Sequence, residues 1–247
     1  MNRKLHIVMT MAGEGRRFTE AGYDTPKPLI DFNGKPLFAK SLETLEGVSF
    51  DTLTCVVRKE HVEKYHIDKE IQKYYPDALI VAVENTTRGA AETAFIAIRA
   101  LILSNLADFT DRLIIMDCDV AVKSVEWKSI IMKPKFDGVL LTFDSNSPKY
   151  SYADVVKGCV TRTAEKDPIS NHALTSPYFI NKIEDFVDAF HEMEEYKDEN
   201  GTLTYKELYV SILYNFMIAN GKKVIIVKAD KITSLGTPEE LNKALGK

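Results

Sequence analysis

The chain has 247 residues, of which 45% are hydrophobic and 28% charged, the composition of an ordinary globular protein. Its net charge of −4 gives no basic excess of the kind that nucleic-acid binding needs, although it is compatible with a local basic pocket for a small anion. No stretch approaches the ~20 apolar residues of a membrane-spanning helix. The three cysteines are widely spaced among apolar residues and favour neither a disulfide framework nor a zinc site. We therefore expect a soluble, cytoplasmic protein that binds neither nucleic acid nor membrane.

The first half of the chain alternates short β-branched runs with stretches whose apolar residues recur every three or four positions. Such alternation predicts parallel strands that are joined by crossover helices. The expected strands are 5–9, 52–57, 78–83, 113–116 and 138–143, and the expected helices are 38–45, 60–75 and 90–103.

The pattern changes after residue 143, where the apolar runs become shorter and less regular. Short strands are expected at 152–156, 159–161 and 178–180, followed by helices at 182–193 and 205–220, a strand at 224–227 and a final helix. Thr237 as N-cap with Pro238 just inside is a strong start signal for that last helix. No internal repeat or linker is present, so we expect one continuous domain over residues 1–247.

A glycine-rich loop follows the first expected strand. Glycines permit positive φ and let backbone N–H groups approach an anion closely, so phosphate is the candidate ligand. A Rossmann fingerprint would need glycine where Phe18 stands, and a Walker A loop would end in Gly-Lys-Ser or Gly-Lys-Thr, so both commoner phosphate loops are excluded. The candidate ligand-binding residues of this loop are Met11, Ala12, Gly13, Glu14, Gly15 and Arg16, with Arg17 next to them.

One lysine, Lys27, stands between two prolines that fix the backbone on both sides of it, which makes it a positioned cation. The alternative is a solvated lysine in a turn. The Gly-x-Gly-x-Arg loop, this Pro-Lys-Pro and the Gly-Lys-Pro at residues 34–36 occur in the order of the nucleotidylyltransferase signature. The chain thus resembles the sugar-nucleotide pyrophosphorylase superfamily, and in particular bacterial nucleotidyltransferases for capsular and surface polysaccharides.

The resemblance implies a single Rossmann-like GT-A domain of the α/β class, with a mixed, mostly parallel sheet flanked by helices. Residues 1–143 would bind the NTP, and residues 144–247 would bind the acceptor. It further implies that a phosphorylated acceptor attacks the α-phosphorus of an NTP, a pyrimidine nucleotide such as CTP, and releases pyrophosphate. Arg17 and Lys27 would be catalytic, because positioned cations accelerate such transfers without a protein nucleophile.

Two carboxylates, Asp117 and Asp119, follow the expected strand 113–116, at the edge where open α/β sheets bind ligands. Mg²⁺ prefers one or two carboxylates together with phosphate oxygens and water. The resemblance makes Asp119 the metal ligand and leaves Asp117 as an alternative ligand or a nucleotide contact. Either acid could instead cap the next helix. Many relatives carry a second metal aspartate where this chain has Ser234, so the sequence leaves the second ligand open.

The remaining candidates also come from the resemblance. Gly89 and Ala90 match a loop that meets the nucleobase, although small residues also open helices for packing reasons. Glu165 and Lys166 match a Glu-Lys-Pro motif for the acceptor, which Asp167 interrupts here, and they could instead be a solvated pair. Glu207 falls where relatives complete the acceptor pocket.

Two rival functions remain open at this point. Asp-x-Asp is also the metal motif of GT-A glycosyltransferases, although these do not need the Pro-Lys-Pro lysine. Ser234 makes a non-catalytic nucleotide sensor a second rival. The sequence does not fix the oligomeric state, the NTP, or whether the acceptor is a sugar phosphate or a phosphorylated non-sugar.

Overall fold

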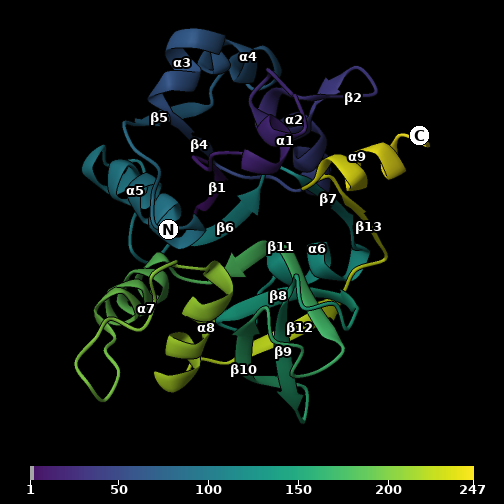
Figure 1. Cartoon of the computed structure of the whole chain (residues 1–247). Helices are drawn as coiled ribbons and strands as arrows, with labels where there is room; N and C mark the ends of the chain where they lie inside the picture. Colours follow the sequence, from purple (N-terminus) through teal and green to yellow (C-terminus); the bar gives the residue numbers. More distant parts are fainter. Residues whose placement is uncertain (1–2) are drawn as a thin grey trace.

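A nine-stranded sheet runs through the centre of the chain in the computed structural model, which describes residues 3–247 (Figure 1). Its main path is β12-β8-β11-β6-β1-β4-β5; β9 pairs with β11, and β10 follows β9. The strands are β1 (Leu5–Met11), β4 (Thr52–Arg58), β5 (Leu79–Val83), β6 (Arg112–Asp117), β8 (Gly138–Asp144), β9 (Ser151–Val156), β10 (Cys159–Glu165), β11 (His172–Ile180) and β12 (Val224–Lys228).

The sheet is mixed and mostly parallel along its main path, which confirms the predicted fold class. Strands β6, β1, β4 and β5 are mutually parallel, and β8 is parallel to β12. Strand β11 runs antiparallel to both β6 and β8, and so joins the first part of the sheet to the second. The segments that follow β1, β5 and β6 therefore gather at one edge of the sheet.

Helices cover both faces of the sheet (Figure 1). Helices α5, α7 and α8 pack on one face, and α2, α4 and α6 pack on the other. The helices are α1 (Arg16–Glu20), α2 (Leu37–Leu42), α3 (Lys59–Tyr65), α4 (Ile67–Tyr74), α5 (Ala90–Leu103), α6 (Val125–Met132), α7 (Ile183–Glu195), α8 (Val210–Ala219) and α9 (Pro238–Ala244). No helix within residues 3–247 is both long enough and apolar enough to cross a membrane.

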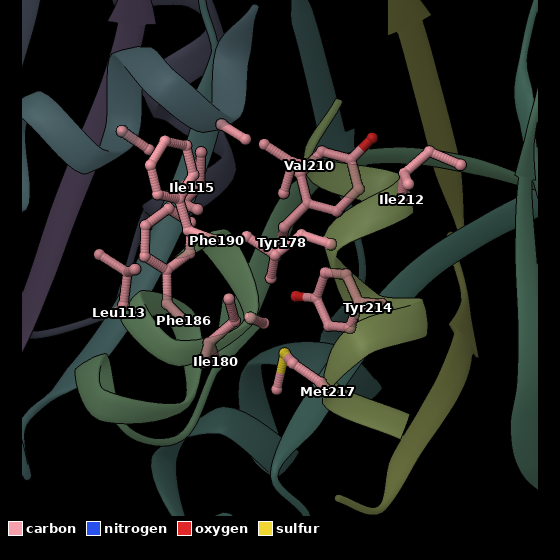
Figure 2. Packing of buried hydrophobic residues seen from close by; sticks show 14 of the residues in the cluster. Leu113, Ile115, Tyr178, Ile180, Phe186, Phe190, Val210, Ile212, Tyr214 and Met217 are labelled. Atoms are coloured by element: carbon pink, nitrogen blue, oxygen red, sulfur yellow. The ribbon is translucent and has the colours of Figure 1, made fainter. Parts of the chain in front are cut away.

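Strand β6 shows why the central strands are apolar throughout. Leu113 and Ile115 pack against Phe186 and Phe190 of α7 in one core, while Ile114 belongs to the core on the opposite face (Figure 2). A strand that is covered on both faces has no polar alternation, which explains the continuous apolar run in the sequence.

Several expected elements have different limits. The expected helix 38–45 is α2 followed by a 3₁₀ turn over Glu43–Leu45, and the expected strand 159–161 extends to Glu165 in β10. Three others differ for a local reason. The expected helix 60–75 is two helices, α3 and α4, because His66 between them adopts a left-handed backbone with φ 51°. The expected helix 205–220 starts only at Val210, because the backbone of Leu208 bonds to the segment before α5. The expected strand 178–180 is the end of the longer β11.

Several short elements carry too weak a pattern to be predicted. They are α1, α6, β2 (Asp31–Phe32), β3 (Lys35–Pro36), β7 (Val120–Lys123) and β13 (Lys231–Ser234). The antiparallel pairing of β13 with β7 sets Ser234 opposite Val120, next to the carboxyl end of β6. The final helix begins as predicted, since the Thr237 hydroxyl accepts a hydrogen bond from the N–H of Glu240 at 3.2 Å.

Candidate active site

A pocket of 790 Å³ opens at the edge of the sheet where β1 and β5 end. Parallel strands bring these ends together, although the segments that follow them lie far apart in the sequence. Its walls are the glycine loop with Arg16 and Arg17, then Lys27, the segment 86–90, and the three side chains Lys166, Lys206 and Glu207.

The glycine loop turns sharply into α1 and presents its basic side chains to this pocket. Gly15 has φ 65°, and a Cβ there would lie 3.2 Å from the Cβ of Lys27, so glycine lets the loop pack directly on the lysine. Phe18 is 1% exposed and packs edge-on against Tyr23, which anchors α1. The aromatic residue that departs from a Rossmann fingerprint is therefore the anchor of this loop.

The loop side chains differ in what they contact. Arg16 pairs with Glu14 at 2.7 Å in an exposed contact. Arg17 lines the pocket and forms no ion pair or side-chain hydrogen bond with any residue from 3 to 247. Met11 is 2% exposed and packs into the core beside α2, so the structure does not bring its side chain into the pocket.

Lys27, which lines the pocket, forms an ion pair with Asp119, which lines an adjoining cavity of 260 Å³. The Lys27 Nζ lies 2.5 Å from the Asp119 Oδ2, and both side chains are about four-fifths buried (24% and 20% exposed). Burial by itself would lower the pKa of Lys27, but Asp119, Cys118 and Asp117 outweigh it and hold that pKa above its ordinary value. The ammonium is therefore charged, and the two carboxylates are its partners.

Asp117 lies deeper than Asp119 and behaves differently. Burial and the nearby charge of Asp119 raise the pKa of Asp117 to about 7, while Lys27 and the Thr10 hydroxyl partly offset the rise. The N–H of Asp117 donates to the Ser176 hydroxyl at 2.8 Å, which fixes the backbone at this point. Two carboxylates crowded in a buried site need more positive charge than one lysine supplies.

The oxygen atoms here fit a hard cation such as Mg²⁺. Residues 3–247 contain no cluster of three or more metal-ligating side chains, so phosphate oxygens and water would complete the shell around Asp119 and Asp117. Gly236 leaves the space beside the Asp119 carboxylate free, because a Cβ at position 236 would lie 2.9 Å from the Asp119 Oδ2. Ser234 lines a cavity of 260 Å³ together with Asp117 and Asp119, and it contributes a hydroxyl rather than a carboxylate.

The segment before α5 forms the far wall of the pocket, where Gly89 and Ala90 lie. Gly89 has φ 144°, and a Cβ there would lie 2.5 Å from the Leu208 carbonyl oxygen. The N–H of Leu208 donates to the Arg88 carbonyl at 2.7 Å, and the Leu208 carbonyl accepts from the N–H of Ala91 at 3.0 Å. Glycine thus allows two backbone segments to join and brings residue 207 to the same pocket.

Glu165 and Lys166, which are consecutive, both line an open pocket of 560 Å³ beside α8, and each also lines one further cavity. Strand β10 ends at Glu165, and Lys166 has a left-handed backbone with φ 56°. Lys166 lines the large pocket and donates to the Tyr209 hydroxyl at 2.8 Å, while that hydroxyl donates to Glu207. Glu165 lines a second cavity of 260 Å³, which also holds Asp117 and Asp119.

The sequence reasoning missed several residues of these walls. Thr10 lines the pocket because it lies just before the glycine loop, so its position could have been inferred from the sequence. Lys206 looks like any surface lysine in the sequence. It reaches the pocket through the backbone bonds of Leu208, which no local pattern reveals.

Comparisons with known proteins agree with this arrangement. The chain is similar to the nucleoside-diphosphate-sugar pyrophosphorylase from Vibrio cholerae RC9, with 26% identity and a TM-score of 0.84 over 98% of this chain and 100% of that one. A putative glucose-1-phosphate thymidylyltransferase from Bacillus anthracis has the same fold at 16% identity, with a TM-score of 0.76 over 98% and 94% of the two chains. So does the inositol-1-phosphate CTP transferase from T. maritima, at 15% identity and a TM-score of 0.74 over 100% and 96%. No curated protein matches the sequence.

The fold is that of a nucleotidyltransferase, an enzyme that binds a nucleotide. Residues 7–127, which carry the glycine loop, Lys27, Gly89 and both aspartates, match the family model of the MobA-like NTP transferase domain.

Proposed function

We propose that this chain is a Mg²⁺-dependent nucleotidylyltransferase that joins an NTP to a phosphorylated small molecule and releases pyrophosphate. The observation that carries this proposal is the ion pair between Lys27, which lines the large pocket, and Asp119, which lines the adjoining cavity and would hold the metal. The NTP is a pyrimidine nucleotide, CTP first. The structural likeness to a CTP transferase supports this choice. The product would serve as a surface-polysaccharide precursor in the cytoplasm.

In this reaction a phosphate oxygen of the acceptor attacks the α-phosphorus, and the bond from that phosphorus to the pyrophosphate oxygen breaks. Arg17, which is without a partner among residues 3–247, and Lys27 hold the triphosphate and stabilise the charge that builds up on the leaving group. When bound at Asp119, with Asp117 behind it, Mg²⁺ supplies further charge stabilisation for the phosphate oxygens. No protein nucleophile is needed.

Each part of the chain binds one of the two substrates. Residues 1–143 supply the glycine loop and the small residues Gly89 and Ala90, which leave room for a flat nucleobase. Residues 144–247 supply Lys166 and Glu207 for the acceptor, and Glu165 in the adjoining cavity. This division supports direct transfer between two bound substrates.

The test is pyrophosphate release from CTP, UTP, dTTP, GTP and ATP, each with Mg²⁺ and a panel of phosphorylated acceptors. Lys27→Ala should cut turnover by about 10²–10³-fold, the loss typical of one oriented charge-stabilising group, with a smaller effect on nucleotide affinity. Lys73→Ala removes an exposed lysine that pairs with Glu70 inside α4, and it serves as the control. Absence of pyrophosphate with every combination would contradict the proposal.

The same experiment separates the rival functions. A GT-A glycosyltransferase would hydrolyse or transfer from a nucleotide sugar and release a nucleoside diphosphate or monophosphate instead of pyrophosphate. A nucleotide sensor would bind NTP without turnover, and Lys27→Ala would then change the affinity alone.

A further inference from the structure

One part of the sequence signature, the Gly-Lys-Pro stretch at residues 34–36, lies outside the candidate active site. None of its three residues, all within the described part of the chain, lines the pocket or the cavity that holds the two acids. In this stretch Gly34 has φ 84°, where the chain turns from β2 into β3, and Pro36 is the N-cap of α2. The N–H of Leu37 donates to the Ile30 carbonyl at 3.0 Å, which fixes the first residue of α2. The stretch therefore determines where α2 begins.

Helix α2 packs against β7, the strand that directly follows the two acids. Phe38 anchors the helix in the core. The hydroxyl of Ser41 in α2 accepts a hydrogen bond from the N–H of Val120 at 3.1 Å. In the 3₁₀ turn that follows α2, the hydroxyl of Thr44 accepts from the N–H of Val122 at 2.9 Å. Both hydroxyl residues are buried, at 0% and 2% exposed, so these bonds are shielded from water.

The two hydroxyls take the place of a neighbouring strand. Strand β7 belongs to a two-stranded sheet and pairs with β13 along one of its edges. On that side the Asp119 carbonyl accepts from the N–H of Leu235 at 2.8 Å. The backbone groups of successive strand residues point to opposite edges, so the N–H groups of Val120 and Val122 point away from β13. A buried N–H without an acceptor destabilises a fold, and the hydroxyls on α2 and its 3₁₀ turn supply the acceptors.

The turn that carries the two acids is thus fixed at both ends. On its first side the N–H of Asp117 donates to the Ser176 hydroxyl at 2.8 Å. On its second side Ser41 accepts from Val120, the residue directly after Asp119. Outer contacts of this kind orient metal ligands, and the loss of one typically costs about 10–100-fold in metal affinity or activity.

We infer that Ser41 and Thr44 are positioning residues for Asp119 as a metal ligand, and that the Gly-Lys-Pro stretch places α2 for this role. The two hydroxyls act through the backbone of β7, which sets the direction of the Asp119 carboxylate. This inference rests on the metal-binding role of Asp119 in the proposed function.

The test measures the Mn²⁺ affinity of the whole chain without nucleotide, by electron paramagnetic resonance. Ser41→Ala removes one acceptor and should weaken Mn²⁺ binding about tenfold. Ser124→Ala is the matched control. Ser124 is also buried, at 4% exposed, its hydroxyl accepts the N–H of Trp127 at 3.3 Å, and it follows the end of β7 that is remote from Asp119. This control should lower the thermal stability but leave the Mn²⁺ affinity unchanged.

Thr44 offers a second pair of variants that tests the hydroxyl alone. Thr44→Val keeps the shape of the side chain but leaves the N–H of Val122 without an acceptor, and it should weaken Mn²⁺ binding about threefold or more. Thr44→Ser keeps the hydroxyl and should bind Mn²⁺ as the wild type does. Amide hydrogen exchange adds a readout without metal. The N–H groups of Val120 and Val122 should be protected in the wild-type protein, and Val122 should lose protection in Thr44→Val.

Wild-type Mn²⁺ affinity in Ser41→Ala overturns the inference, and so do equal losses in Ser41→Ala and Ser124→Ala, because the hydroxyl would then serve stability alone. Fast exchange of both N–H groups in the wild-type protein, or no Mn²⁺ binding by it, also overturns the inference, and neither result depends on whether a variant folds. The measurements need no turnover. The expected pattern without pyrophosphate release would therefore contradict the proposed function alone.

Discussion

The Lys27 Nζ and the Asp119 Oδ2 lie 2.5 Å apart, although 92 residues separate them in the sequence. The lysine follows the glycine loop, and the aspartate follows β6, so the parallel pairing of β1 with β6 brings them together. Without nucleotide, the ammonium thus lies where the metal would bind. Under the proposed function, the ammonium would exchange this carboxylate for a phosphate, and the lysine and the metal would compete for one oxygen.

This competition predicts how the protein without nucleotide binds a metal. Lys27→Met should raise its affinity for Mn²⁺ about tenfold or more, because Asp119 then loses its ion-pair partner and Asp117 loses a neighbouring positive charge. Electron paramagnetic resonance of Mn²⁺ measures the change directly. Lys73→Met is the matched control. Equal affinities in wild type and Lys27→Met would show that the lysine does not occupy the metal position.

Asp119→Asn should abolish this metal binding and reduce turnover by about 10²-fold or more, because an amide oxygen carries no charge for the metal. The loss should persist at high Mg²⁺ if Asp119 is the main ligand, and pyrophosphate release over a Mg²⁺ series measures it. Asp77→Asn on the surface is the control. Full activity of Asp119→Asn at moderate Mg²⁺ would show that another carboxylate binds the metal.

Gly89→Ala should weaken nucleotide binding about tenfold and destabilise the fold by about 1–3 kcal/mol. The added Cβ would lie 2.5 Å from the Leu208 carbonyl oxygen, so the two backbone segments must separate. Thermal shifts with and without CTP report both effects. Gly158→Ala, at a positive φ of 79° rather than 144°, meets nothing within 4 Å, so it shows the cost of a left-handed backbone without a clash. Equal effects of the two substitutions would mean that the contact with Leu208 does not matter.

Asp111 provides a stability prediction away from the site. Its carboxylate accepts hydrogen bonds from the N–H groups of Lys4 at 2.8 Å and Asp108 at 2.9 Å, and it contacts His6 at 3.2 Å. Burial acts to raise the pKa of Asp111, but these donors outweigh it and hold the pKa below its usual value. Asp111→Asn should lower the free energy of unfolding at neutral pH by about 1.5–3 kcal/mol, the range for hydrogen bonds to charged groups.

The pH dependence follows from the lowered pKa. The stabilisation by Asp111 is fully present above the pKa of the unfolded chain, near 4, and is lost as the pH falls through the lower pKa of the folded protein. Urea unfolding from pH 7 to 3 should therefore show wild type and Asp111→Asn converging in acid. Asp198→Asn, whose exposed carboxylate also accepts two backbone N–H bonds, should have a smaller effect. A constant difference at all pH values would contradict this account.

The sequence by itself determined what depends on local chemistry. The glycine loop, the proline-flanked Lys27 and the acids after β6 could be recognised, because φ freedom, a fixed lysine and the end of an apolar strand are properties of short segments. Helix α5 has the predicted limits, since its apolar repeat is strong and glycine precedes it. The parallel strand pattern also predicted that these segments meet at one edge of the sheet.

Only the tertiary structure decided what depends on backbone bonds between distant segments. Leu208 bonds to residues before and at the start of α5, which shortens α8 and carries Lys206 and Glu207 to the nucleotide pocket. Glu165 lines the cavity of Asp117 and Asp119, and Lys166, which has a left-handed backbone, lines the nucleotide pocket, although the two residues are adjacent in the sequence. Such contacts join residues about a hundred positions apart, and their free energy comes from both partners at once. No single stretch of sequence therefore contains the signal.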